Sequence, residues 1–144
     1  MKKIVKLTTW AAAVLLAQAS LAATTDSWTS NKLAPNVVIA QTENSNFYTT
    51  PISVPKGALI TTVSWDVGLY DNGAAGQFFT VCYARRYTTS YDICYDLTNM
   101  RVGSTTLFKG LDAKGQFKIT GVLSGGTYPV YPRHRNTITV EYQY

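Results

Sequence analysis

The strongest constraint on the fold is an alternation of apolar and polar side chains in two segments of the chain. Over Leu59–Leu69 the odd-numbered positions include Leu, Val and Trp, whereas the even-numbered positions are mostly polar or small. Asn136–Tyr144 shows the same alternation, with Ile, Val and Tyr on one face. A period of two residues is typical of β-strands, because successive side chains point to opposite faces. The pattern predicts that Trp65 is buried and that Asp66 is exposed.

Further strands are expected where short apolar runs lie between turn signals. These runs are Asn36–Gln41, Gln77–Ala84, Tyr91–Leu97 and Gly115–Val122, the last with Phe117 and Ile119 on one face. Turns are expected at Tyr70–Gly73 and Ser124–Gly126, while Pro129 and Pro132 exclude a central strand between them. The pattern predicts an all-β fold, a single antiparallel β-sandwich or partly open barrel of about seven or eight short strands.

The N-terminal 22 residues have the layout of a secretory signal peptide. A basic head with Lys2, Lys3 and Lys6 precedes an apolar stretch that is too short to span a bilayer. Small residues at Ser20 and Ala22 predict cleavage after Ala22. We therefore expect residues 1–22 to be removed and residues 23–144 to form one domain in the periplasm, with the cell surface or the medium as alternatives. Residues 23–35 are polar and are expected to be loosely ordered, apart from Trp28, a candidate core plug.

Charge argues against a nucleic-acid partner. Three of the 13 Lys and Arg residues leave with the signal peptide, and none of the 8 Asp and Glu residues does, so the mature chain carries a net charge of only +2. Basic residues cluster only at Arg85–Arg86 and Arg133–Arg135. These two short clusters do not form the basic stripe that nucleic-acid binding requires. No second apolar run approaches the length of a membrane helix, so we expect no membrane span in the mature chain.

Cys82 and Cys94 are the only cysteines. In an exported chain, an even and closely spaced pair predicts a disulfide, here stapling the two arms of a hairpin. Free thiols are disfavoured in an oxidising compartment. A metal site lacks ligands, because the chain has one His and no further Cys. We expect no metal and no cofactor.

No catalytic constellation emerges from the residue pattern. His134 is the only histidine, and it lies between two arginines with no partner nominated to orient it. The carboxylates are scattered, and no glycine-rich phosphate loop is present. We therefore expect a protein that is not an enzyme.

The one unusual local feature is a polar hairpin tip, Arg85–Ser90, which is surrounded by tyrosines. Tyr and Arg often carry recognition surfaces because they combine large contact area with polar groups. Arg85, Arg86 and Tyr87 are therefore candidate protein-binding residues. Tyr83 and Tyr95 are assigned a structural role, pairing across the strands and covering the disulfide. The basic segment at Arg133–Arg135 is the alternative site.

Taken in order and spacing, several short motifs resemble the FlhE family of small periplasmic proteins, which are encoded with the flagellar export apparatus of enteric bacteria. The resemblance covers nearly the whole mature length and rests on Ser27-Trp28, Thr61–Trp65, Cys82, Cys94–Leu97, Ser124–Gly126 and Asn136–Tyr142. The segment between the cysteines is longer than the family pattern leads us to expect, and it contains the tip. A partner bound there need not be the partner of the family.

The resemblance implies a non-enzymatic accessory role in flagellum biogenesis. Its partners would be flagellar rod or hook subunits or the export apparatus, and it would act either as a chaperone for exported subunits or as a plug against proton leakage. Two rivals are a chaperone–usher fimbrial subunit, with Thr24–Pro35 as its donor extension, and a secreted carbohydrate-binding or toxin-accessory domain that uses the tyrosine-rich tip. Against the fimbrial subunit, the segment that would form the donor extension is polar.

Overall fold

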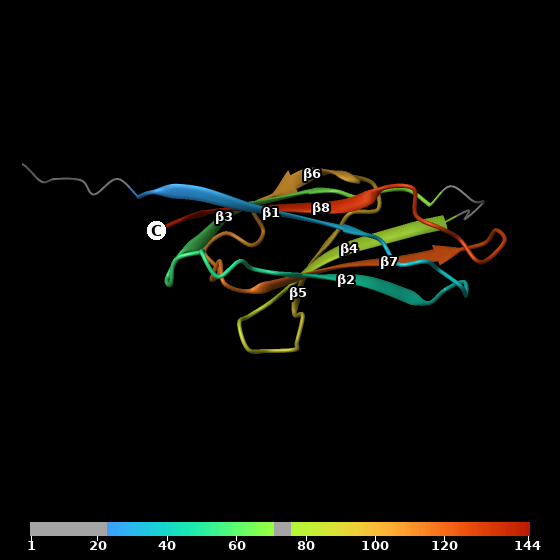
Figure 1. Ribbon diagram of the computed structural model, residues 1–144, viewed down its shortest axis with the longest axis horizontal. Helices are drawn as coiled ribbons and strands as arrows, with labels where there is room; N and C mark the ends of the chain where they lie inside the picture. The colour runs from blue at the N-terminus through green and yellow to red at the C-terminus, as the bar shows by residue number, and fades with distance from the viewer. Residues whose placement is uncertain (1–22, 71–75) are drawn as a thin grey trace, which may run out of the picture.

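The computed structural model describes residues 23–70 and 76–144, and this part of the chain is all-β (Figure 1). The predicted signal peptide and most of the predicted Tyr70–Gly73 turn lie outside the described residues. The described residues contain no helix with the length and hydropathy needed to cross a bilayer. The strands are β1 (Thr25–Leu33), β2 (Glu43–Thr49), β3 (Leu59–Asp66), β4 (Gly76–Ala84), β5 (Ile93–Asp96), β6 (Val102–Thr105), β7 (Gln116–Ser124) and β8 (Arg135–Gln143).

The strands form two open four-stranded antiparallel sheets, in the orders β1-β8-β3-β6 and β2-β7-β4-β5. Figure 1 shows them as two layers, so the molecule is a sandwich and not a partly open barrel. The chain changes sheet at every connection between described strands except one. Only β4 and β5 are consecutive strands that pair with each other. The hairpin that carries the tip is therefore the one local pairing in the fold.

The core fills the space between the two sheets with aromatic and branched side chains. Trp65 of β3 is 3% exposed and packs against Tyr95 of β5 with a ring separation of 5.3 Å. Trp28 of β1 is also buried and contacts Phe117 of β7 at 6.3 Å. Each of these pairs joins one sheet to the other, which is the arrangement expected of a sandwich. Asp66, the neighbour of Trp65, is exposed.

The N-terminal segment corrects the expectation of loose order over residues 23–35. Residues 25–33 form β1, which pairs along its whole length with β8, from Thr25 opposite Gln143 to Leu33 opposite Arg135. Its polar side chains are compatible with an edge strand, because the outer face and the free edge both contact water. Trp28 is the only buried side chain of this strand, so the sequence shows no alternation of apolar and polar residues.

Two other expectations about strands are wrong. The apolar run Asn36–Gln41 is a connection with a single bridge, Val37 to Val130, and its Val38 and Ile39 side chains are exposed. The strand lies just beyond it, as β2, whose mostly polar sequence gave no signal. The edge strand β6 was also missed, because it has only four residues and its one large apolar side chain, Val102, faces solvent.

The predicted alternation over Leu59–Leu69 holds from Val63 to Val67 but fails at both ends, since Leu69 is 44% exposed and Gly68 is buried. Ile60 is buried and Leu59 is 41% exposed, the reverse of the prediction. The cause is an irregularity in the pairing of β3 with β8 between Ile60 and Thr62, which shifts the register by one residue. A one-residue shift exchanges the two faces of a strand. The strand also ends at Asp66, earlier than predicted.

The remaining strand predictions are confirmed with small changes in bounds. In β7, Phe117, Ile119 and Leu123 face the core, and Gly121 belongs to the same inner face. A side chain at Gly121 would run into the ring of Phe79, which lies directly opposite on β4. In β8, Ile138, Val140 and Tyr142 are buried as expected, but Tyr144 lies beyond the strand and is half exposed.

Candidate functional site

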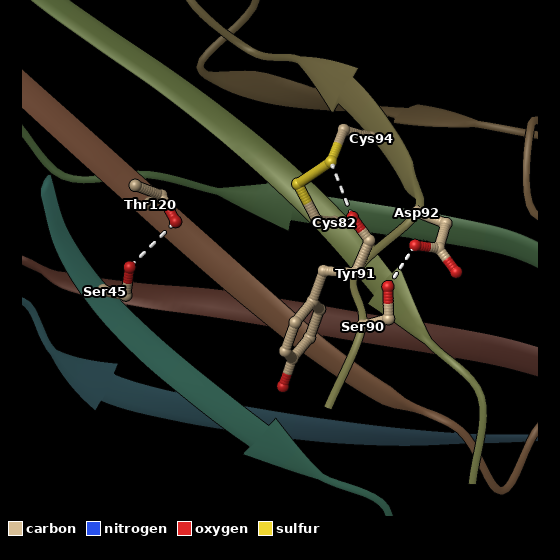
Figure 2. The surroundings of a disulfide bond; sticks show 7 residues. All are labelled: Ser45, Cys82, Ser90, Tyr91, Asp92, Cys94 and Thr120. Atoms are coloured by element: carbon tan, nitrogen blue, oxygen red, sulfur yellow. Dashed lines mark hydrogen bonds between the residues drawn. A yellow bond between two sulfur atoms is a disulfide. The ribbon is translucent and has the colours of Figure 1, made fainter. Parts of the chain in front are cut away.

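The disulfide between Cys82 and Cys94 is present and lies at the base of the tip. The two residues are directly opposite each other in the β4–β5 ladder, with Cα atoms 4.0 Å apart. Figure 2 shows the bond spanning the two strands. It closes the hairpin two residues before β4 ends at Ala84 and one residue after β5 begins at Ile93. The backbone that supports the tip is therefore covalently held on both arms.

Tyr83 and Tyr95 are structural, but they do not cover the disulfide as predicted. Tyr83 is buried in the core against Phe117 at 5.4 Å, and the partly buried Tyr95 packs on the core against Trp65 at 5.3 Å. The Tyr83 hydroxyl donates to the Asp112 carbonyl oxygen at 2.9 Å. Because neighbouring residues in a strand face opposite ways, the cysteines point to the outer face of the sheet while the tyrosines point inward.

The tip itself is a tight and exposed loop. The Thr88 N–H and the Thr88 hydroxyl both donate to the Arg85 carbonyl oxygen, at 3.1 and 2.9 Å. Between them, Tyr87 has a φ of 64°, in the left-handed region that residues other than glycine seldom adopt. Its ring is 83% exposed, and the Arg86 guanidinium lies 4.5 Å from the ring centre. The loop thus holds a Tyr and an Arg together in solvent at a cost in backbone strain.

Tyr91, just after the tip, folds back onto the outer face of the β2-β7-β4-β5 sheet. Its ring lies 6.1 Å from the ring of Phe47, and the Lys118 Nζ atom lies 5.0 Å from its centre. Burial raises the pKa of the Tyr91 hydroxyl. Figure 2 shows this side chain beside the sheet, close to the hydrogen bond between Ser90 and Asp92. Tyr87 is therefore the one tyrosine of the hairpin that extends freely into solvent.

Two adjoining hollows lie beside the tip, and Arg86, Tyr87 and Lys114 line both of them. One continues over the segment 49–52, and the other continues over Lys56 and Arg85 towards the turn at residues 110–112. Sequence reasoning identified Arg85, Arg86 and Tyr87 but missed Ile52, Lys56 and Lys114. These residues come from separate loops, and only the packing of the sandwich brings them to one end.

The alternative site at Arg133–Arg135 lies in another place. All three residues are exposed, and they line a hollow with Asp66, Arg101 and Val102 that shares no residue with the hollows beside the tip. The Arg135 Nε atom donates to Asn31 Oδ1 at 2.6 Å, which ties the start of β8 to β1. His134 lies against the backbone of Gly68, where it leaves no room for a side chain.

The described residues bring no three His, Cys, Asp or Glu side chains together in a way that would hold a metal ion. The carboxylates near the tip have local roles. Asp112 accepts a hydrogen bond from the Lys114 N–H at 2.8 Å, and Asp92 accepts one from Ser90. The tip therefore presents cationic and aromatic side chains, which are suited to recognising a partner.

Comparison with known proteins bears on this architecture. No protein-family model matches the chain, and no curated protein matches it significantly. A crystal structure of FlhE superposes with a TM-score of 0.67 at 18% sequence identity, covering 83% of this chain and 98% of the FlhE chain. The chain has the fold of FlhE. This confirms the resemblance drawn from the sequence motifs at the level of the backbone.

At 18% identity, the likeness to FlhE describes the arrangement of the strands and not the side chains on its surface. The likeness therefore gives no information on the tip residues or on the hollows beside them. Function belongs to sites that vary on a shared fold, so the tip must be tested directly.

Proposed function

We propose that this protein is a non-enzymatic accessory protein of flagellum biogenesis that acts outside the cytoplasm as a binding module. The observation that carries the proposal is the FlhE fold, which spans nearly the whole FlhE chain. The predicted signal peptide and the Cys82–Cys94 disulfide support export to an oxidising compartment, for which the periplasm is the first choice.

The tip is the proposed binding surface. Arg85, Arg86 and Tyr87 are all exposed, and the disulfide holds the loop that carries them. Backbone strain at Tyr87 is not needed to close a hairpin, since a glycine there would relieve it. Retained strain together with an exposed ring favours a recognition role, because Tyr and Arg commonly dominate the binding energy of interfaces.

Two finer roles fit a module of this kind. The protein would bind flagellar rod or hook subunits as a chaperone during export, or it would bind the export apparatus as a plug against proton leakage. Both roles require a protein partner and neither requires catalysis. The experiment below tests the partner surface that they share.

Two structural observations argue against the alternative functions, a fimbrial subunit and a carbohydrate-binding or toxin-accessory domain. A fimbrial subunit would offer Thr24–Pro35 to a neighbouring subunit, but residues 25–33 already pair with β8 of the same chain. A carbohydrate-binding tip would use a cluster of exposed tyrosines, but Tyr83 is buried, Tyr95 packs against Trp65, and Tyr91 packs on the sheet. Tyr87 alone does not form such a cluster.

The test is complementation of a gene deletion with Arg85→Ala, Arg86→Ala and Tyr87→Ala combined. We expect this variant to fail in flagellar assembly or envelope proton tightness. Its stability should stay within about 0.5 kcal/mol of the parent, because exposed residues contribute little to folding. The matched control replaces Arg133, His134 and Arg135 with Ala, and it should complement. Full complementation by a folded tip variant, with failure of the control, would move the site to residues 133–135.

A further inference from the structure

The two hollows beside the tip adjoin each other at one end of the sandwich, and we call the surface that they form together the trough. Their shared wall is made by Arg86, Tyr87 and Lys114. The loops on either side are tied together: the Ala113 N–H donates to the Ala58 carbonyl oxygen at 2.8 Å, and the Thr50 hydroxyl donates to the Ala113 carbonyl oxygen at 3.2 Å. The surface is therefore held in shape before any partner arrives.

Charge in the trough is strongly asymmetric. Lys56, Arg85, Arg86 and Lys114 line it, and Asp112 is the only carboxylate among its lining residues. The Asp112 side chain already accepts the Lys114 N–H. The mature chain as a whole is nearly balanced, so this excess of positive charge is local. Complementary charge on a partner would guide its association and its orientation.

One end of the trough also exposes apolar surface. Ile52 is 97% exposed, and it lines the same hollow as Pro51 and Tyr87. An isolated exposed isoleucine needs no explanation on a protein surface. Here, however, it lines the same hollow as Tyr87, which is 83% exposed, within a cationic surface. The hollow can therefore receive an apolar side chain that lies between anionic groups.

We propose that the trough binds an extended acidic segment of the protein partner, with an apolar residue seated between Ile52 and Tyr87. The proposal rests on the proposed function and specifies the chemistry of the partner. A membrane surface would also supply negative charge. However, a membrane is flat, so it would meet the exposed cations from outside without filling the hollow that Ile52 and Tyr87 line. An extended chain can contact the cations and also place a side chain in that hollow.

The experiment measures fluorescence anisotropy of a short labelled peptide of glutamates and serines with one central leucine. We expect binding to the purified mature protein, weakened about tenfold when NaCl rises from about 50 to about 500 mM, because salt screens exposed charges. A peptide with lysines in place of the glutamates should not bind. A peptide with serine in place of the leucine should bind at least about threefold more weakly.

The variants separate this trough from general attraction to a basic protein. Lys56→Ser and Ile52→Ser should each weaken binding by about threefold or more, whereas Lys109→Ser should not change it. Lys109 is exposed and lies on a neighbouring turn, but it does not line the trough. Equal effects of Lys56→Ser and Lys109→Ser would overturn the proposal, as would equal binding of the lysine peptide. Binding to vesicles rich in phosphatidylglycerol but not to the peptide would overturn it in favour of a membrane.

The outcome is distinguishable from failure of the proposed function. If the tip variant fails to complement but the unsubstituted protein does not bind the acidic peptide, the tip is still the binding surface and the proposed chemistry of the partner is wrong. If the peptide binds in the trough but the tip variant complements fully, the trough stands and the flagellar role of the tip is wrong.

Discussion

The two buried tryptophans allow a sharp test of how the core is held. Trp65 and Trp28 are almost equally buried, at 3% and 6% exposed, and each packs against an aromatic ring of the other sheet. They differ in one respect. The Trp65 Nε1 atom donates to the Met100 carbonyl oxygen at 2.6 Å, whereas the Trp28 Nε1 atom has no hydrogen-bond partner among the described residues.

The structure sets the expected magnitudes. A buried tryptophan side chain removes about 200 Å² from water, worth up to about 5 kcal/mol at about 25 cal/mol per Å². Allowing for partial relaxation of the cavity, Trp65→Ala should lower the free energy of unfolding by about 4 kcal/mol. Trp65→Phe should cost about 1–2 kcal/mol more than Trp28→Phe, because only the former leaves a carbonyl oxygen without its hydrogen bond.

The assay is urea unfolding of the oxidised protein comprising residues 23–144, followed by far-ultraviolet circular dichroism so that loss of tryptophan does not alter the signal. Equal midpoint shifts for Trp65→Phe and Trp28→Phe, at an unchanged slope, would refute a contribution from the hydrogen bond to Met100. A loss below about 2 kcal/mol for Trp65→Ala would refute the assignment of Trp65 to a closely packed core.

Three other predictions concern the hairpin and the buried tyrosines. Replacing Cys82 and Cys94 together with Ala should lower the free energy of unfolding by about 3 kcal/mol, because a loop of 12 residues in sequence separation is released in the unfolded chain; a loss under about 1 kcal/mol in urea would contradict this. Burial raises the pKa of Tyr48 and of Tyr70 to about 12, against 10.0 ordinarily, so their contribution to stability is complete below about pH 10 and is lost as pH rises towards 12. Ultraviolet titration should show these two as a late phenolate step, and a single step near pH 10 would exclude their burial. Tyr87→Gly should raise stability by about 0.5–1 kcal/mol by relieving the left-handed backbone, while weakening partner binding; a lower melting temperature would show that the ring supports the loop.

The sequence was sufficient to predict those parts of the fold that depend on residues close together in the chain. The alternation in β8 needed no partner to be recognised, because its inward residues from position 138 onward, Ile138, Val140 and Tyr142, are all apolar. The Cys82–Cys94 hairpin was predicted for a related reason: β4 and β5 are the one consecutive pair of strands in a common sheet, so their pairing is local in sequence. The tip followed directly from that hairpin.

Features that depend on distant segments were decided by the tertiary structure. The edge strand β1 is polar except for Trp28 and its last residue, Leu33, and it is a strand only because β8 offers its ladder hydrogen bonds more than 100 residues later in the sequence. The exchange of Leu59 and Ile60 follows from a bulge against β8, which the alternation in β3 alone does not reveal.

The candidate site divides in the same way. Arg85, Arg86 and Tyr87 are adjacent in the sequence and were identified from their residue types. Ile52 and Lys114 lie beside them only through the tertiary fold. All connections except β4–β5 cross between the sheets, and this brings remote loops to one end of the sandwich. Exposure cannot be read from residue type when a Tyr is buried at position 83 and exposed at position 87. The sequence alone determined most of the strands, the disulfide and the tip. The packing of the two sheets decided which side chains meet around that tip.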